Sequence, residues 1–256
     1  MNICLFTEDE IHKPLPLCDE RGEHIVKILH KKEGDTFSAG IIGGPAGTAQ
    51  ITQITDKTTS GGGSISFAFK PESDGKPLYP LTLIIGFPRP IQLKRLLRDA
   101  AGLGACAVHL TGTELGEKSY MQSSLVERGA AYRMLLDGTV QAAGTHVPEL
   151  FLHKTLKECL SSVNSGSTRK IVLDNIRAAC PLTSFLATHP VKNDDGSVIP
   201  VMAAIGSERG WTDRERTLLE SDGWTRCTMG QRILRTETAA TVAASVILAA
   251  MGELDT

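Results

Sequence analysis

The chain has 256 residues, which is enough for two small domains or one large one with a substantial hydrophobic core. Hydrophobic residues make up 41% of the chain and charged residues 22%, and both values are ordinary for a globular protein. The formal charge of −2 excludes a strongly basic protein, although a local basic patch would still be compatible with an RNA partner.

Six cysteines are scattered without a Cys-x-x-Cys pair, which favours reduced thiols over a disulfide framework or a zinc site. We therefore expect no metal. The N-terminus has no basic stretch followed by an apolar run, so no signal peptide is visible. The apolar run at 239–251 is shorter than the ~20 residues that span a bilayer. These features predict a soluble, cytoplasmic protein with no membrane partner.

Residues 1–76 are predicted to form a small β-barrel. The segment 24–44 reads as an apolar β-segment, a tight turn and a glycine-rich return strand. Residues 48–54, "TAQITQI", alternate between polar and apolar as a half-buried strand does, and 59–70 add a loop and a strand. The segment 71–80 is rich in proline, glycine and charge, and we expect it to be a linker with a domain boundary near residue 77.

Residues 77–256 alternate between predicted strands and helices, which indicates a mostly parallel sheet with helices on both faces. The predicted strands are 81–87, 105–110, 170–175, 184–190, 198–207 and 225–229. The predicted helices are 90–104, 119–143 with a break near Asp137-Gly138, one beginning at Thr212, and one within 229–252. Thr212 and Glu215 have the spacing of a capping box.

Three predicted strand ends carry polar or glycine residues, and ligands of parallel sheets bind at such ends. They are Thr188-His189-Pro190, the loop Gly206–Gly210 and Met229-Gly230. The chain has no P-loop, no dinucleotide fingerprint in the right order, no GxSxG and no HExxH. A Ser-His-Asp triad is possible by composition alone, which carries almost no information.

Two glycine-bearing loops with Glu and Arg remain as candidates. "GSERG" has a plain alternative as a surface turn before a capped helix. In "RTET", Thr236 could cap the helix and Glu237 would complement its dipole. Capping does not explain Arg235, because the dipole disfavours a cation at a helix N-terminus. Arg235 is therefore the sharpest indication of a site from the residues alone.

The helix after this loop is apolar nearly all round, from Ala239 to Leu248, and is expected to be buried on most sides. Its small residues allow close packing, either in the core of a monomer or against a second subunit. The residues leave both alternatives open.

"IGSERGWTDRE" followed by "GQRILRTETA" resembles the motifs of the RsmE-type 16S rRNA uracil-N3 methyltransferases of the SPOUT superfamily. Upstream, "HIVKILHKKEGD", "VPEL" and "THP" are similar to further family motifs in the same order, so the resemblance spans nearly the whole chain. The chain departs from the family pattern at His30, Asp99, Gly102, Val140, Gly144, Ser207 and Arg209.

The resemblance implies a trefoil-knotted SPOUT domain at 77–256 and a PUA-like RNA-binding barrel at 1–76. It also implies a homodimer that uses S-adenosylmethionine to methylate N3 of a uridine in 16S rRNA or the small ribosomal subunit, with no DNA partner. The implied cofactor-binding residues are His189, Pro190, Ile205, Gly206, Ser207, Glu208, Gly210, Met229, Gly230, Ile233, Leu234 and Thr238.

For catalysis we expect Arg232 or Arg235 to stabilise developing negative charge or to grip phosphate. Glu208 or Glu237 would orient groups or accept the proton of uracil N3. RNA contacts are expected from Lys27, His30, Lys31, Lys32, Arg89 and Arg95, and each basic cluster has the alternative of a solvated face. Two other functions stay open: a SPOUT methyltransferase for another rRNA or tRNA position, and a non-catalytic RNA-binding dimer.

Overall fold

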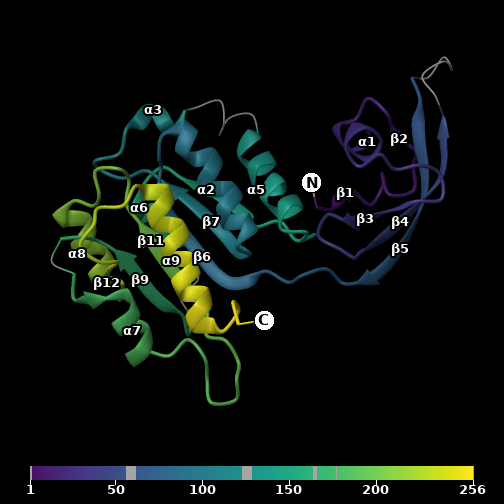
Figure 1. Cartoon of the computed structure of the whole chain (residues 1–256). Helices are drawn as coiled ribbons and strands as arrows, with labels where there is room; N and C mark the ends of the chain where they lie inside the picture. The colour runs from purple at the N-terminus through teal and green to yellow at the C-terminus, as the bar shows by residue number, and fades with distance from the viewer. Residues whose placement is uncertain (1, 56–61, 123–128, 164–165, 177, 256) are drawn as a thin grey trace. The chain divides into compact units, whose positions relative to one another are not determined.

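The computed structural model describes residues 2–55, 62–122, 129–163, 166–176 and 178–255. The chain divides into two compact units (Figure 1). The N-terminal unit comprises Met1–Pro77 and Thr139–Val147, and the C-terminal unit comprises Leu78–Gly138 and Pro148–Thr256. The sequence placed a boundary near residue 77 but assigned 139–147 to the second domain, whereas the structure joins these nine residues to the first.

The N-terminal unit is built on a curled five-stranded sheet in the order β1-β3-β4-β5-β2. The pair β1 and β3 is parallel, and the other described pairs are antiparallel. Its elements are β1 (Cys4–Phe6), β2 (Leu15–Pro16), α1 (Glu20–Glu23), η1 (His24–Ile28), β3 (Thr36–Ile41), β4 (Ala46–Thr55) and β5 (Ser64–Ser73).

The apolar segment at 24–28 was predicted to be a β-segment, and this is wrong because it forms the π-helix η1. The side chain of Asp19 accepts a hydrogen bond from the backbone N–H of Arg21 and starts α1, which runs directly into η1. Ile25 of this helical stretch is fully buried and joins the core formed by the sheet. Helix capping and core packing therefore make this segment helical, although its apolar pattern predicted an extended strand.

The C-terminal unit contains a seven-stranded sheet in the order β10-β12-β9-β11-β6-β7-β8, and its described strand pairs are all parallel. This confirms the predicted parallel sheet. The strands are β6 (Tyr79–Gly86), β7 (Ala105–Thr111), β8 (Glu149–His153), β9 (Arg169–Leu173), β10 (Cys180–Pro181), β11 (Val201–Ile205) and β12 (Thr225–Thr228).

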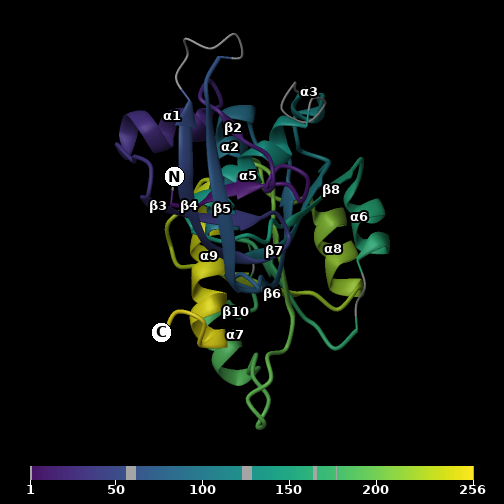
Figure 2. The same ribbon diagram turned by 90° about the vertical axis from the view of Figure 1, so that its right-hand side faces the viewer.

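Helices cover both faces of this sheet, as predicted. They are α2 (Pro90–Gly102), α3 (Lys118–Met121), α5 (Ala130–Gln141), α6 (Leu156–Ser162), α7 (Leu182–Thr188), α8 (Asp213–Ser221) and α9 (Thr236–Met251). Figure 2 shows α6 and α8 on one side of the sheet and α2 and α9 on the other. Trp211 and Trp224 are buried in the core beneath α6 and α8, and α9 packs against α2, β6 and β11.

Two predicted elements differ in the structure. The segment 184–190 was predicted to be a strand, but Leu182–Thr188 forms α7. Its buried residues Leu182, Phe185 and Leu186 have the i, i+3, i+4 spacing of a helix that packs one face, here against α9 and β12. The predicted break near Gly138 is also absent, since α5 runs continuously from Ala130 to Gln141.

The strand order changes direction in the middle of the sheet. From β6 the chain adds β7 and β8 on one side, and β9, β11 and β12 lie on the other side. A change of direction of this kind leaves room for ligands beyond the carboxyl ends of the strands. No helix of the described residues is both long and apolar enough to cross a bilayer.

Candidate functional site

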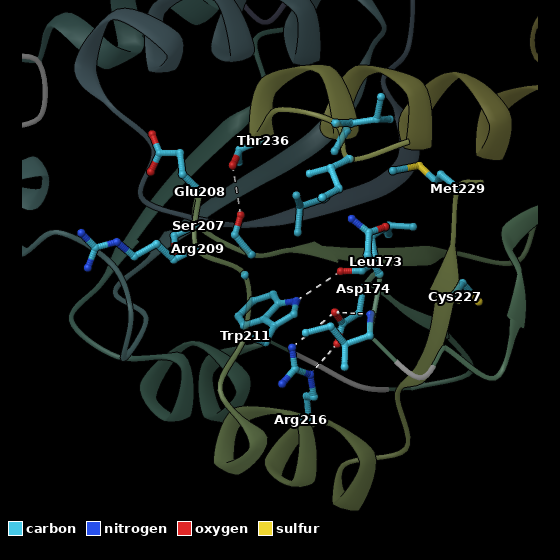
Figure 3. A pocket seen from close by; sticks show the side chains of 18 of the residues that line it. Leu173, Asp174, Ser207, Glu208, Arg209, Trp211, Arg216, Cys227, Met229 and Thr236 are labelled. Atoms are coloured by element: carbon cyan, nitrogen blue, oxygen red, sulfur yellow. Dashed lines mark hydrogen bonds and ion pairs between the residues drawn. The ribbon is translucent and has the colours of Figure 1, made fainter. Parts of the chain in front are cut away.

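A cavity of about 290 Å³ lies at the carboxyl ends of β9, β11 and β12 (Figure 3). It is lined by four stretches, of which the last two are close together in sequence. These stretches are Leu173–Ile176 after β9, Ile205–Trp211 after β11, Met229 after β12, and Arg232–Leu234 with Thr236 and Ala239 at the start of α9; Arg216 and Cys227 complete the lining. The two loops that carried the sequence motifs therefore meet in one cavity.

The loop after β11 turns tightly because of its glycines. Gly210 has φ +73°, a conformation that side chains disfavour, and its N–H donates to the carbonyl of Ser207 at 2.8 Å. A Cβ at Gly206 would lie 3.1 Å from the Cα of Gly210, so any other residue there would push the two ends of the loop apart by a few tenths of an ångström. The result is a cavity wall in which no Cβ covers the backbone at Gly206 and Gly210, so a flat ligand can approach closely.

The wall formed by β9 is held by a hydrogen-bond network. The indole Nε1 of Trp211 donates to the carbonyl of Leu173 at 3.3 Å, and the backbone N–H of Asp174 donates to the carbonyl of Cys227 at 3.0 Å. The carboxylate of Asp174 accepts from the N–H of Ile176 at 3.1 Å. These bonds tie the ends of β9 and β12 and the glycine loop into one rigid frame.

Arg216 of α8 completes this frame from below the cavity. Its guanidinium donates to the carboxylate of Asp174 at 2.6 Å and to that of Asp213 at 2.8 Å. The side chains of Arg216 and Asp174 are only 11% and 5% exposed, so this ion pair is shielded from water. The hydrogen bond that Arg216 donates to Asp174 raises the pKa of Arg216 and keeps the guanidinium charged.

The start of α9 is fastened to the glycine loop. Thr236 was considered as a helix cap, but the N-cap is Arg235, and the side chain of Arg235 makes no capping bond. Thr236 is instead the first residue of α9, and its hydroxyl donates to the carbonyl of Gly206 at 3.3 Å. This bond places Arg232, Ile233 and Leu234 along the cavity.

The structure brings together most of the residues predicted from the second half of the chain. The cavity is lined by Ile205, Gly206, Ser207, Glu208, Gly210, Met229, Arg232, Ile233 and Leu234. The predicted residues that do not line it are His189, Pro190, Gly230, Arg235, Glu237 and Thr238. His189 follows the last residue of α7 and stacks on Phe185 with ring centroids 4.4 Å apart, so the expectation that it ends a strand is wrong.

Sequence reasoning missed the wall residues Leu173, Asp174, Asn175 and Ile176, together with Trp211 and Arg216. The signal was present in "KIVLDN", an apolar strand that ends in Asp174-Asn175. The end of β9 lies beside the ends of β11 and β12. The sequence predicted Thr188-His189-Pro190 at this position instead.

The two predicted glutamates occupy different surroundings. A carboxylate oxygen of Glu208 accepts from the backbone N–H of Arg89 at 2.9 Å and lies 3.9 Å from the guanidinium of the same residue. Figure 3 shows Glu208 and Arg209 on the side of the cavity away from Met229. Glu237 is buried in the first turn of α9, where a negative charge complements the helix dipole.

The residues predicted to contact RNA lie on exposed surface in both units. In the N-terminal unit, Lys27 is paired with Glu23 at 2.6 Å, and His30, Lys31 and Lys32 follow η1 in a loop where His30 and Lys32 are exposed and Lys31 is half-buried. In the C-terminal unit, Arg89 is exposed at the N-cap position of α2 without a side-chain capping bond, and Arg95 is exposed on the same helix. The Lys27 pair is an exposed i, i+4 contact and contributes little to stability.

A buried cluster near the carboxyl ends of β7 and β8 consists of His109, His153 and Cys159, whose ligand-type atoms all lie within 4.8 Å of one another. Nδ1 of His109 and Nε2 of His153 are 2.9 Å apart, and the ring planes differ by 6°. This is the geometry of a direct hydrogen bond between two imidazoles. Burial, and then His153, lowers the pKa of His109 to about 4.

Comparison with known proteins gives consistent matches. The model of the RNA methyltransferase domain family matches residues 74–248. Ribosomal RNA small subunit methyltransferase E of Treponema pallidum (strain Nichols) is 39% identical, with 97% of this chain and 91% of the relative covered. Ribosomal RNA small subunit methyltransferase E 1 of Borreliella burgdorferi is 31% identical, with 97% and 98% covered.

The fold is also similar to solved structures. The crystal structure of a ribosomal RNA small subunit methyltransferase E from Neisseria gonorrhoeae bound to S-adenosyl methionine matches with a TM-score of 0.73 at 21% identity. The match covers 97% of each chain, so both units of the present fold have counterparts there.

Proposed function

The chain belongs to the family of ribosomal RNA small subunit methyltransferase E proteins, and from this premise we propose that it methylates N3 of a uridine in 16S rRNA with S-adenosylmethionine. The observation that carries the proposal is the convergence of the glycine loop after β11 and the segment before α9 in one cavity. The same two segments bear the motifs that resemble this family.

The residues present fit S-adenosylmethionine. The glycine loop offers backbone that no Cβ covers, and Leu173, Ile205 and Leu234 offer apolar surface for a flat base. We assign the cofactor to this cavity, held by backbone groups of the loop and of the segment 229–234. The cofactor supplies a methyl group on a positively charged sulfur, which makes that methyl an electrophile.

The protein's own part in the reaction is to orient the uracil and manage its charge. Uracil N3 carries a proton at neutral pH, so its attack requires proton removal and stabilisation of negative charge. Arg232 lines the cavity and is the better candidate for this stabilisation, whereas Arg235 lies outside it and is suited to a phosphate. Glu208 and Glu237 remain the candidates for orienting groups or accepting the proton.

The N-terminal unit is proposed to bind RNA as a PUA-like domain, through the exposed residues His30 and Lys32 and the half-buried Lys31. A cytoplasmic location follows from a ribosomal substrate. We also retain the proposal that the C-terminal segment forms a trefoil knot, supported by the bond from Thr236 to the loop residue Gly206.

A homodimer is supported by apolar surface on the C-terminal unit. Ile233 before α9 is 87% exposed, Ile91 of α2 is 78% exposed, and Val242 of α9 is 37% exposed. Because α2 and α9 pack against each other, these side chains are placed where a second subunit could cover them together. The measurement is the mass in solution by light scattering, and a monomer at micromolar concentration would remove this part of the proposal.

The methylation proposal is tested with the purified protein, S-adenosylmethionine and either naked 16S rRNA or isolated small subunits. N3 lies on the pairing edge of uracil, so methylation there stops primer extension and locates the nucleotide. Calorimetry measures cofactor binding separately. Cofactor binding without any new stop would contradict N3 chemistry, and absence of both would favour a non-catalytic RNA-binding protein.

Within this reaction, Arg232→Ala should lower kcat by about 100-fold or more, because removal of one charge-stabilising donor typically has an effect of this size. Arg235→Ala should mainly raise KM for RNA. Arg133→Ala is the matched control, since Arg133 is exposed on α5 and does not line the cavity. Equal kcat for Arg232→Ala and the control would remove Arg232 from catalysis.

A further inference from the structure

A second cavity of about 710 Å³ lies at the carboxyl ends of β6, β7 and β8 and has no part in the function proposed so far. Its apolar lining comes from four side chains on different elements, namely Phe87, Met121, Leu156 and Leu218. Its size and mixed lining are those of a small-molecule or nucleotide site.

Three lysines, Lys118, Lys154 and Lys157, line this cavity and are exposed. None of them forms an ion pair with a carboxylate of the described residues. Unpaired ammonium groups around an apolar floor favour an anion that also carries a flat apolar group.

The carboxylates in the same lining are largely engaged with protein groups. Both oxygens of Glu215 accept backbone N–H groups, from Glu114 and from Thr212, each at 2.9 Å. Glu114 accepts from the hydroxyl of Thr212 at 2.8 Å and lies 3.7 Å from the guanidinium of Arg214. Glu117 contacts the hydroxyl of Ser119 at 3.5 Å. The three lysines are therefore the cations of this lining that pair with no carboxylate of the described residues, and the exposed carboxylate of Glu117 remains as a negative charge in the same lining.

The second cavity adjoins the first. Helix α8 contributes Arg216 to the first cavity and Arg214 and Leu218 to the second. The hydroxyl of Thr113, in the second cavity, donates to the hydroxyl of Ser207, in the first, at 3.0 Å. The two cavities therefore share helix α8 and are linked by the hydrogen bond between Thr113 and Ser207.

We propose that this second cavity binds a nucleotide of the RNA close to the one that is methylated, with its base on the apolar floor and its phosphate on the three lysines. The inference rests on the proposed function, since it takes RNA as the substrate. Bases splayed out of single-stranded RNA are recognised by apolar contact and by cations that neutralise the backbone. Such a nucleotide would fix the register of the RNA relative to the methyl donor.

The test measures binding of a fluorescent ten-residue oligouridylate at several salt concentrations, with S-adenosylmethionine saturating. The variant Lys154→Ala/Lys157→Ala should bind about 10-fold more weakly, and the slope of log affinity against log salt should fall by ~0.7 for each phosphate that the protein no longer neutralises. Cofactor affinity should not change. The control Arg133→Ala/Lys192→Ala removes the same charge from exposed residues that line neither cavity.

The charge-preserving variant Lys154→Arg/Lys157→Arg should restore both affinity and slope, which a merely structural role for the lysines would not predict. An alanine variant with the affinity and salt slope of the control overturns the inference. The readout is independent of methyl transfer, so a protein that binds oligouridylate through these lysines but methylates no rRNA would refute the proposed function alone.

Discussion

At the scale of single residues, the ion pair between Arg216 and Asp174 connects folding to the cofactor cavity. Arg216→Ala leaves the buried carboxylate of Asp174 without its cation, and breaking such a pair costs about 3–5 kcal/mol. The variant should lose a stability of this order and bind S-adenosylmethionine more weakly, because Asp174 also holds the wall at Ile176. Chemical denaturation and calorimetry measure the two effects.

Arg214→Ala is the matched control for this prediction. Arg214 lies two residues away on the same helix, its side chain is 88% exposed, and its contact with Glu114 is 3.7 Å long. Exposed pairs contribute about 0–1 kcal/mol, so its stability and cofactor affinity should match the unchanged protein. Equal losses for the two variants would show that the buried pair has no special role.

The same scale shows how far the sequence could predict the site. Gly206, Arg232 and Leu234 were found because they lie in motifs that are contiguous in the chain. Asp174 and Trp211 were missed as site residues because their roles depend on contacts with Arg216 and Leu173, 42 and 38 residues away. A hydrogen bond between residues this far apart in the chain produces no periodic pattern that a single sequence could reveal.

At the scale of elements, the packing of α2 against α5 explains a glycine inside a helix. A Cβ at Gly138 would lie 2.3 Å from the carbonyl oxygen of Arg98 and 2.9 Å from Cβ of Ala101. Gly138→Ala would raise helix propensity by about 1 kcal/mol, but overpacking against backbone costs about 1–3 kcal/mol. We expect net destabilisation, measured as a lower midpoint of urea unfolding.

Gly102→Ala provides the comparison, because Gly102 ends α2 and an added Cβ there would meet no atom within 4 Å. This variant should be neutral or more stable by up to about 1 kcal/mol. If Gly138→Ala were instead more stable, then α2 and α5 could move apart to admit the added methyl group at little cost.

Element types were predictable where the apolar pattern was unambiguous, as for β6, β11 and α9. The errors fell on short segments. Leu182–Thr188 and His24–Ile28 each contain a compact apolar cluster, which a strand or one helical turn can bury equally well. Their state is decided by neighbours, namely α9 and β12 for α7 and the sheet core for η1.

At the scale of the whole molecule, the buried imidazole pair predicts a pH dependence of stability for the C-terminal unit. The pKa of His109 is lowered to about 4 by burial and by His153, whereas an unfolded histidine titrates near 6.5. Between these values the unfolded chain binds the proton and the folded chain does not. The contribution of His109 to stability is therefore fully present above about pH 6.5 and is lost as pH falls toward 4.

Burial also lowers the pKa of His153, which adds to the loss of stability in acid, although Glu158 opposes that shift. His109→Gln keeps a hydrogen-bonding side chain but cannot titrate. Its drop in unfolding free energy between pH 7.5 and 5 should be smaller than that of the unchanged protein, by on the order of 2 kcal/mol.

Tryptophan fluorescence reports the unfolding of the C-terminal unit alone. Trp211 and Trp224 are the chain's two tryptophans, and both are buried in the core of this unit. The control is His12→Gln, which removes an exposed histidine from the N-terminal unit and should leave the acid loss unchanged. An undiminished acid loss in His109→Gln would mean that the imidazole pair accepts a proton without disrupting its hydrogen bond. The acid sensitivity of this unit would then have to arise from other groups, among them His153, whose pKa burial also lowers.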